Sequence, residues 1–246
     1  MTKTIHIDAR YNKKIKLSGR LINHLKKQGV KSAALFASVQ FLDLMIVKQQ
    51  LRKIGAAANT TKAIRCDKES QILGCDCFND SFNSDIINKS DIVLYIGDGL
   101  FHPKAILLSQ IKNKQKKQVI LYNPVSKQFK ILTQKDIEQQ INKIKSNLRK
   151  FVLADKIGIV VSVKPGQEHL ELALKLKEKL EKEKKKVFIF ITDSLTFNEL
   201  ENFPFIKAWV NSACPRIAID DILHTEKTIV NIKQAFNAIN ELEEIN

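Results

Sequence analysis

The strongest constraint on the fold is a repeated alternation of short apolar runs with amphipathic segments. The clearest apolar run, residues 91–96, is continuous, which is typical of a parallel strand buried on both faces. A glycine-containing turn at 97–99 and a helix-like segment at 104–111 follow it. The same alternation recurs along the rest of the chain. Strands separated by helices favour parallel sheets with right-handed crossovers, so the sequence predicts an α/β fold.

A long polar segment, residues 134–153, divides this alternation and is predicted to be a connecting helix. We therefore expect two similar α/β domains, at residues 1–150 and 151–246. The predicted strands are 4–10, 32–37, 56–64, 91–96, 118–122, 128–132, 156–163, 187–192, 206–210 and 227–232. The predicted helices are 17–28, 40–54, 104–111, 134–153, 168–182 and the final segment, with a helical turn at 198–202.

The composition is that of an ordinary globular protein, with 44% hydrophobic and 27% charged residues. No apolar run approaches the roughly 18 residues that a membrane span needs. Residues 1–7 also lack the apolar core of a signal peptide. We therefore expect a cytoplasmic protein with no membrane partner.

The formal charge of +15 raises the question of nucleic-acid binding. Only six of the 41 basic residues are arginine. Arginine is the side chain whose bidentate fork suits base readout and phosphate clamping. The lysine excess is therefore interpreted as a compositional bias spread over solvated surfaces, and we do not expect a nucleic-acid partner.

Four cysteines carry the most distinctive chemistry: Cys66, Cys75, Cys77 and Cys214. In a cytosolic protein, cysteines are more often metal ligands or catalytic groups than disulfide partners. Neither a CxxC pair nor a histidine at zinc-finger spacing is present, so we expect no structural zinc site. Cys214 lies between a predicted strand and a proline, at a strand end where open α/β sheets bind ligands. Cys75 lies in a predicted loop without apolar periodicity. It is either a small buried hydrophobic residue or a ligand.

Three loops follow the carboxyl ends of predicted strands, at residues 97–103, 164–167 and 211–216. Their glycines let the backbone approach a ligand and present N–H groups to an anion, although any such loop needs turn residues. Gly97-Asp98-Gly99 does not match GxGxxG, so the dinucleotide fingerprint is absent. His102 precedes a proline and a predicted helix, where it either caps the helix or faces an anionic substrate group.

Four motifs occur in order along the chain and become specific when taken together. They are Gln71–Cys75, Tyr95–Pro103, Val161–Gln167 and Asn211–Asp221. The set resembles the 2-(3-amino-3-carboxypropyl)histidine synthases of diphthamide biosynthesis, of the archaeal type. The resemblance covers nearly the whole chain.

The resemblance implies a fold of three similar Rossmann-like domains with parallel sheets, each contributing one cysteine to a 4Fe–4S cluster. It also implies a noncanonical radical enzyme. The family transfers a 3-amino-3-carboxypropyl group from S-adenosylmethionine to a histidine of translation elongation factor 2, using an electron donor. Cys75 matches the ligand of the middle domain and Cys214 that of the last domain. Residues 1–150 and 151–246 therefore resemble the second and third domains.

The chain departs from the family pattern because the first domain and its cysteine have no counterpart in it. Several sources of a third ligand stay open. Cys66 or Cys77 supplies it locally, or a homodimer partner or a paralogous or split synthase subunit brings the missing domain. Alternatively, the chain holds no catalytic cluster.

By position in the matched motifs, the resemblance also implies a cosubstrate site. Arg216 is expected to act in catalysis by clamping a carboxylate. Asp220 and Asp221 are expected to pair with Arg216, fix the loop or meet an amino group; the equal alternative is that they cap the following turn. The residues expected to line the cosubstrate site are Gly97, Asp98, Gly99, His102, Lys164, Gly166, Gln167, Arg216 and Asp220.

Three other functions compete with this interpretation. A non-catalytic accessory subunit of a diphthamide synthase would retain the fold without the activity. A pair of anion- or nucleotide-binding Rossmann-like domains would hold its cysteines for structural reasons. Quinolinate synthase has a similar three-domain architecture, but the strings at 97–103 and 214–221 do not look like its motifs.

Overall fold

A computed structural model describes residues 10–74, 76–77, 81–113, 115–164 and 166–245. The chain divides into two compact units, unit 1 (Met1–Ile137) and unit 2 (Glu138–Asn246). This division falls earlier than the boundary expected near residue 150, because the connecting helix belongs to unit 2. The predicted strand at 4–10 lies outside the described residues except for Arg10.

Unit 1 is built on a five-stranded sheet with the order β2-β1-β3-β4-β5. Its first four strands are parallel, whereas β5 is antiparallel to β4. Only four residues separate β4 from β5, too few for the crossover that a parallel pair needs, so these two strands form a hairpin. The strands are β1 (Ser32–Ala37), β2 (Ala57–Asn59), β3 (Ile92–Ile96), β4 (Gln118–Asn123) and β5 (Gln128–Leu132).

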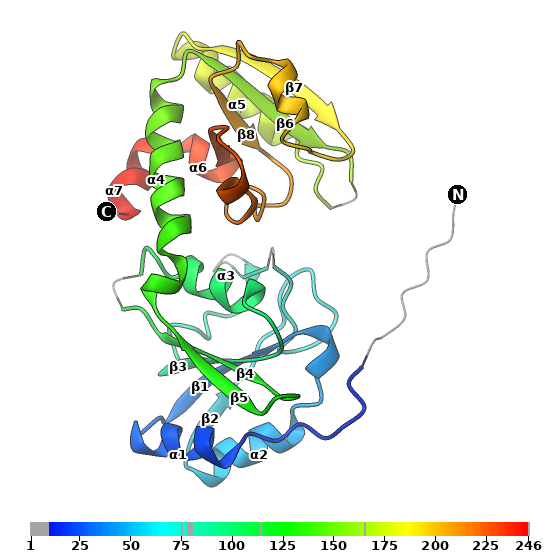
Figure 1. Ribbon diagram of the computed structural model, residues 1–246, viewed down its shortest axis with the longest axis vertical. Coiled ribbons are helices and arrows are strands. Elements are labelled where there is room, and N and C mark those ends of the chain that lie inside the picture. Colours follow the sequence, from blue (N-terminus) through cyan, green and yellow to red (C-terminus); the bar gives the residue numbers. More distant parts are fainter. Residues whose placement is uncertain (1–9, 75, 78–80, 114, 165, 246) are drawn as a thin grey trace, which may run out of the picture. The chain divides into compact units, whose positions relative to one another are not determined.

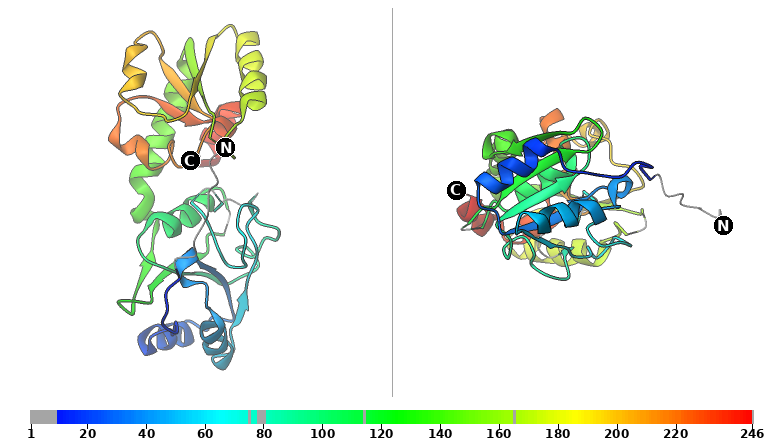
Figure 2. Two further views of the ribbon diagram at one scale, coloured as in Figure 1. Left: turned by 90° about the vertical axis from the view of Figure 1, so that its right-hand side faces the viewer. Right: turned by 90° about the horizontal axis from the view of Figure 1, so that it is seen from below.

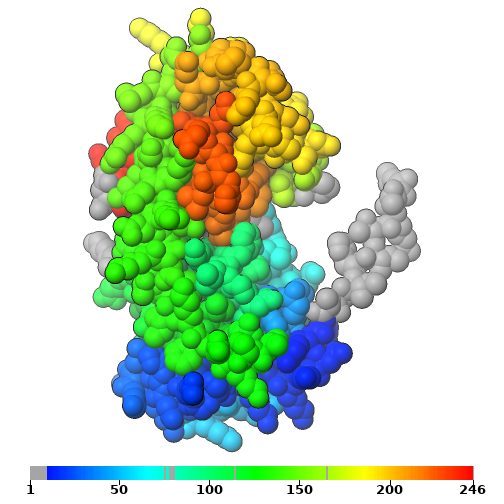
Figure 3. All heavy atoms as spheres, in the orientation of Figure 1, coloured from blue at the N-terminus to red at the C-terminus, as the bar shows by residue number. Residues whose placement is uncertain are grey.

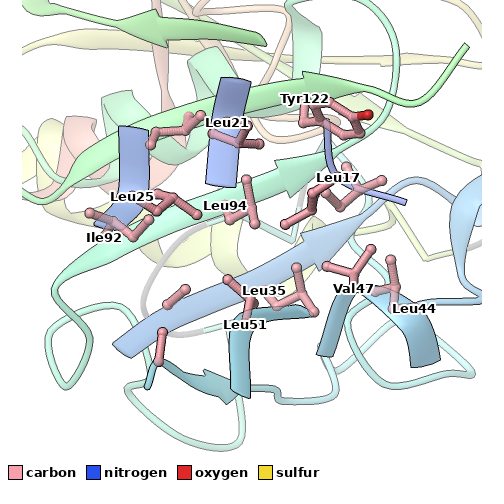
Figure 4. Packing of buried hydrophobic residues seen from close by; sticks show 14 of the residues in the cluster. Leu17, Leu21, Leu25, Leu35, Leu44, Val47, Leu51, Ile92, Leu94 and Tyr122 are labelled. Carbon is pink, nitrogen blue, oxygen red and sulfur yellow. The ribbon is translucent and has the colours of Figure 1, made fainter. Parts of the chain in front are cut away.

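Helices cover both faces of this sheet. Helices α1 (Gly19–Lys27) and α2 (Met45–Lys53) lie side by side on one face, and α3 (Phe101–Ser109) lies on the other (Figures 1 and 2). Leucines of α1 and α2 pack against Leu35, Leu94 and Tyr122 of the central strands (Figure 4). All of these core residues are almost completely buried.

Local sequence explains where these helices begin and end. The Ser18 hydroxyl accepts a hydrogen bond from Leu21 N and so caps the start of α1, and Gly29 follows its end with a φ of +65°. Helix α2 begins at Met45, later than the predicted residue 40, because a separate 3-10 turn (Val39–Phe41) precedes it. Helix α3 begins at Phe101, earlier than predicted, so Pro103 lies within its first turn, where a proline is tolerated.

Unit 2 contains a four-stranded, fully parallel sheet with the order β7-β6-β8-β9. Helix α5 packs against β6 and β7, and α4 packs against β8 and β9. None of the helices in the described part of the chain has the length and apolar content needed to cross a bilayer. The elements are α4 (Glu138–Leu153), β6 (Lys156–Ser162), α5 (Leu170–Lys182), β7 (Lys186–Thr192), β8 (Ala208–Asn211), β9 (Ile229–Asn231), α6 (Ile232–Phe236) and α7 (Ala238–Ile245).

Gly158, in the middle of β6, is required by close packing in unit 2. A Cβ atom there would lie 2.5 Å from Cε3 and Cζ3 of Trp209, which is almost fully buried on the neighbouring strand β8. The Trp209 indole can therefore pack against β6 only if residue 158 has no side chain.

We expect Gly158→Ala to lower the free energy of unfolding of unit 2 by about 1–3 kcal/mol, because the new methyl group overpacks the core. Trp209 is the only tryptophan in the chain, so its fluorescence during a urea titration reports on unit 2. Gly19→Ala is the matched control, since nothing lies within 4 Å of a Cβ at that position. An unchanged urea midpoint for Gly158→Ala would contradict the packing argument.

Candidate functional site

The first part of the candidate site lies at the carboxyl end of strand β1. Here the segment that leads to Cys75 extends the sheet: Ala37 N donates to Ser70 O at 2.7 Å, and Ile72 N donates to Ala37 O at 3.2 Å. Strand β1 also neighbours β3, whose end leads into residues 97–102. The segment that leads to Cys75 and the loop at 97–102, which are distant in sequence, therefore lie at the ends of adjacent strands.

Contacts on either side of Cys75 tie its loop to the protein, although Cys75 itself lies outside the described residues. A Cβ atom at Gly74 would overlap the Phe101 ring, so the backbone of this loop passes directly against the first residue of α3. On the other side, the Asp76 carboxylate is almost fully buried and accepts a hydrogen bond from Arg65 N at 3.0 Å. Cys75 is thus flanked by two positions that packing holds in place.

Cys66 and Cys77 are both buried within unit 1. The Cys66 Sγ atom donates to Asp76 Oδ2 at 3.8 Å, and the Cys77 Sγ atom donates to Leu73 O at 3.1 Å. Cys77 is completely inaccessible, and Cys66 is 3% exposed. Both thiols therefore stabilise the loop from inside. Among the described residues, no three His, Cys, Asp or Glu side chains are grouped so that they could hold a metal ion.

Residues 97–102 form a turn with an exposed tip and a buried root. Gly97 N donates to Tyr122 O at 3.0 Å, whereas Asp98 and Gly99 are exposed, and Gly99 has a φ of +64°. His102 lies in the first turn of α3, where its Nδ1 atom is 3.1 Å from the Tyr95 hydroxyl. The histidine is therefore positioned by a partner in β3 and does not precede the helix as predicted.

The Tyr95 hydroxyl is an unusual partner because its side chain is completely buried. Burial raises the pKa of Tyr95 far above its ordinary value, and the nearby Asp98 carboxylate acts in the same direction. Tyr95 therefore stays protonated at physiological pH. Its hydroxyl can orient the His102 ring without contributing charge to the site.

The second part of the candidate site is the loop that carries Cys214, after strand β8 of unit 2. The Asn211 side-chain amide donates to Cys214 O at 2.8 Å and to Asn231 Oδ1 at 2.9 Å. Asn231 in turn donates from Nδ2 to Pro215 O at 2.9 Å. Two asparagines at the ends of neighbouring strands thus fix the backbone on both sides of the Cys214–Pro215 peptide bond, while Cys214 itself is partly exposed.

Arg216 is buried within the same loop, with only 3% of its surface exposed. Its guanidinium group forms an ion pair with Asp220, one helical turn further along, and Asp220 N donates to Arg216 O at 2.8 Å. Asp221 is exposed at the start of the next 3-10 turn (Asp221–His224). Of the alternatives for the two aspartates, this geometry gives Asp220 the role of pairing with Arg216.

The loop after β6 borders the Cys214 loop because β6 and β8 are neighbours. Ser212 joins them: both its backbone N and its hydroxyl donate to Val160 O, at 3.1 and 2.9 Å. Within the loop, Lys164 N donates to the Ser162 hydroxyl and Gln167 N donates to Lys164 O. Lys164 and Gly166 are exposed and Gln167 is partly buried. Unit 2 therefore presents a partly exposed cysteine, Cys214, on one loop and the exposed residues Lys164 and Gly166 on the neighbouring loop.

A comparison with known families identifies the protein family of this chain. The family model described as "Putative diphthamide synthesis protein" matches residues 2–245. The chain belongs to this family. The match covers both units, so the family includes both the Cys75 loop and the Cys214 loop.

Curated relatives from archaea carry a more specific name. A 2-(3-amino-3-carboxypropyl)histidine synthase from Pyrococcus horikoshii is 27% identical over 215 residues, which cover 87% of this chain and 58% of the relative. A synthase of the same name from Methanocaldococcus jannaschii is 28% identical over 170 residues, which cover 68% of this chain and 46% of the relative. The chain thus spans about half the length of these relatives.

A solved structure of Dph2 from Pyrococcus horikoshii with a 4Fe–4S cluster is also similar. It matches with a TM-score of 0.72 and 25% identity, covering 92% of this chain and 61% of that protein. A second structure of the same protein gives a TM-score of 0.73. The predicted fold class, two Rossmann-like domains with parallel sheets, is confirmed, and the predicted family is confirmed.

Sequence reasoning missed several residues that build the family's loops in this chain. Asn231 lies outside every matched motif, and Tyr95, although it opens a matched motif, shows its role only through burial and hydrogen bonds, as does Asp76. Asn211 was within a matched motif, and an asparagine at the end of an apolar strand is a signal that could have identified it. The other three carry no comparable signal in the sequence.

Proposed function

We propose that this chain provides two domains of a diphthamide-forming 3-amino-3-carboxypropyl transferase. The observation that carries the proposal is the Cys214 loop, which holds a partly exposed thiol on a hydrogen-bonded frame in a member of the diphthamide synthesis family. The proposed reaction moves the group from S-adenosylmethionine to a histidine of elongation factor 2. The activity is a proposal for the assembled enzyme, since the chain spans only part of its relatives.

Cys75 and Cys214 are the residues we propose as ligands of a 4Fe–4S cluster. Thiolates are the usual ligands of such clusters, and the fixed backbone around Cys214 suits a ligand that must not move. When bound, the cluster would supply the electron that cleaves the sulfonium cosubstrate, after an external donor has reduced it. Cys66 and Cys77 fit a ligand role less well, because both thiols are buried and bonded inside unit 1.

We therefore favour a third thiolate from another polypeptide, either a second copy of this chain or a subunit that resembles the family's first domain. The second candidate is a non-catalytic accessory subunit of such an enzyme.

The remaining chain residues receive roles from their position. The exposed loop tips at Asp98 and Gly99, and at Lys164 and Gly166, would contact the cosubstrate. His102, held by Tyr95, and Gln167 would complete the lining. Because Arg216 forms an ion pair with Asp220, we assign it the role of positioning the Cys214 loop. Direct binding of the substrate carboxylate by Arg216 would require this ion pair to open.

The test is anaerobic reconstitution with iron, sulfide and a reductant, followed by an assay with labelled S-adenosylmethionine and elongation factor 2. We expect the broad visible absorption of an iron–sulfur cluster and transfer of label to the factor when the chain is combined with a subunit that resembles the family's first domain. If the two proteins form a complex but the partner alone transfers the label equally well, the catalytic role of this chain is excluded and the accessory role remains.

A further inference from the structure

Almost all of the net positive charge of this protein lies in one of its two units. Residues 1–137 contain 24 of the 41 Lys and Arg residues but only 10 of the 26 Asp and Glu residues. Unit 1 therefore has a formal charge of +14 and unit 2 a charge of +1. Lys and Arg are nearly as frequent in unit 2, with 17 in 109 residues against 24 in 137, so the difference in charge comes from the acidic residues, 16 of which lie in unit 2. The basic residues themselves are therefore spread over both units, and it is the acidic residues that are depleted in unit 1.

Within unit 1, the imbalance comes from two long segments that contain no acidic residue. Residues 10–42 contain eight basic residues, and residues 99–135 contain another eight. Neither segment contains Asp or Glu, so no acidic neighbour along the chain offsets these charges. A lysine-rich composition alone does not produce two segments of this length without an acidic residue.

The fold places parts of these two segments beside each other. The Tyr122 hydroxyl, on β4, donates to Lys16 O at 2.7 Å, and the His24 ring of α1 lies 5.4 Å from the Phe129 ring of β5. Figure 3 shows the blue surface of the first segment meeting the green surface of the β4–β5 hairpin. The first acid-free segment and the β4–β5 hairpin of the second thus lie side by side.

The basic side chains of this surface point outward. Leu21 and Leu25 of α1 are completely buried, whereas Arg20 and Lys27, seven residues apart and so on one stripe of the helix, are exposed. We call the following exposed residues the basic face: Lys13, Lys14, Lys16, Arg20, Lys27 and Lys127.

The chemistry of the basic face indicates what it fits. Protein–protein interfaces are depleted in lysine and enriched in arginine and aromatic residues, whereas lysine contacts nucleic-acid phosphates without reading sequence. Single-strand binders add aromatic platforms for base stacking. Here the nearby aromatic rings are occupied within unit 1: Tyr11 packs on Phe41 and Phe129 on His24.

We propose that the basic face of unit 1 binds the sugar–phosphate backbone of a double-stranded nucleic acid, without base readout. The partner class follows from three features: high positive charge, dominance of lysine and no exposed stacking ring among the described residues of the face. The proposal does not depend on the transferase function.

The test measures binding of the full chain to a short labelled RNA duplex by fluorescence anisotropy over a series of salt concentrations. A triple variant, Lys13→Gln, Lys14→Gln and Lys16→Gln, is expected to weaken binding at least about tenfold at low salt and to make the slope of log K against log salt shallower by about 2–3. A DNA duplex of the same sequence should bind similarly if the phosphate backbone alone is read.

The matched control removes the same charge from exposed lysines of unit 2, by Lys175→Gln, Lys186→Gln and Lys207→Gln. It should bind like the wild type. Equal losses in both triple variants would show that only net charge matters and would overturn the proposal. Tighter binding to polyglutamate than to either duplex would assign the face to an acidic protein, and preference for single-stranded RNA would also overturn it. Unchanged circular dichroism confirms that each variant is folded.

Discussion

Replacing Cys214 with alanine is expected to remove most of the iron from the reconstituted protein and to abolish group transfer. The reason is that a cluster bound through few protein thiolates cannot lose one of them without losing its site. The backbone around position 214 should be unaffected, because its hydrogen bonds come from Asn211 and Asn231. Iron content and visible absorption, measured under anaerobic conditions, give the result directly.

The control for this experiment is Cys77→Ala. Cys77 is completely buried and bonded to Leu73 O, so its loss should leave the iron content of the reconstituted protein unchanged. The urea midpoint of Trp209 fluorescence shows that unit 2 of the Cys214 variant remains folded. A Cys214→Ala protein that retains its full iron content would disprove the assignment of this ligand.

Asn211→Ala is expected to have the second large effect. Asn211 is 1% exposed and its side chain bonds to Cys214 O, Asn231 Oδ1 and Ala213 N. Alanine would leave these buried groups without partners, at a cost of about 2–4 kcal/mol in the free energy of unfolding of unit 2. We also expect less iron to be retained, because the Cys214 loop would no longer be held. Both quantities are measured on the same preparation.

Asn202→Ala provides the comparison, since Asn202 is exposed in the same unit. Its effect on the Trp209 transition should be within about 0.5 kcal/mol, as for most surface substitutions. If Asn211→Ala were as mild as Asn202→Ala, the two-asparagine frame would not be what holds the loop.

Much of the fold could be predicted because buried parallel strands leave a plain signal in sequence. The continuous apolar runs at 32–37, 91–96 and 118–122 correspond closely to β1, β3 and β4. Their order along the chain implies helical crossovers, and the loops at their carboxyl ends follow from topology. Helix starts were predicted less well, as α2 and α3 show, because local 3-10 turns and prolines within the first turn shift them.

The site was predicted only in outline. Motif order identified the loops, but not what holds them, because Asn231 and Asp76 act through contacts across the unit. The burial of Arg216 and its pairing with Asp220 could not be inferred from the string that contains them, since an arginine after Cys-Pro is equally compatible with a solvent-facing clamp.

Asn231 has one consequence that reaches past the site. It supports Pro215 O, receives the Asn211 amide and also forms the capping box at the start of α6 with Gln234. The same residue therefore ends the last strand, begins the next helix and braces the Cys214 loop. Order in the carboxyl-terminal segment and order in that loop are therefore coupled through this residue. By thermodynamic linkage, anything that binds only the ordered loop would protect the end of the chain from proteases.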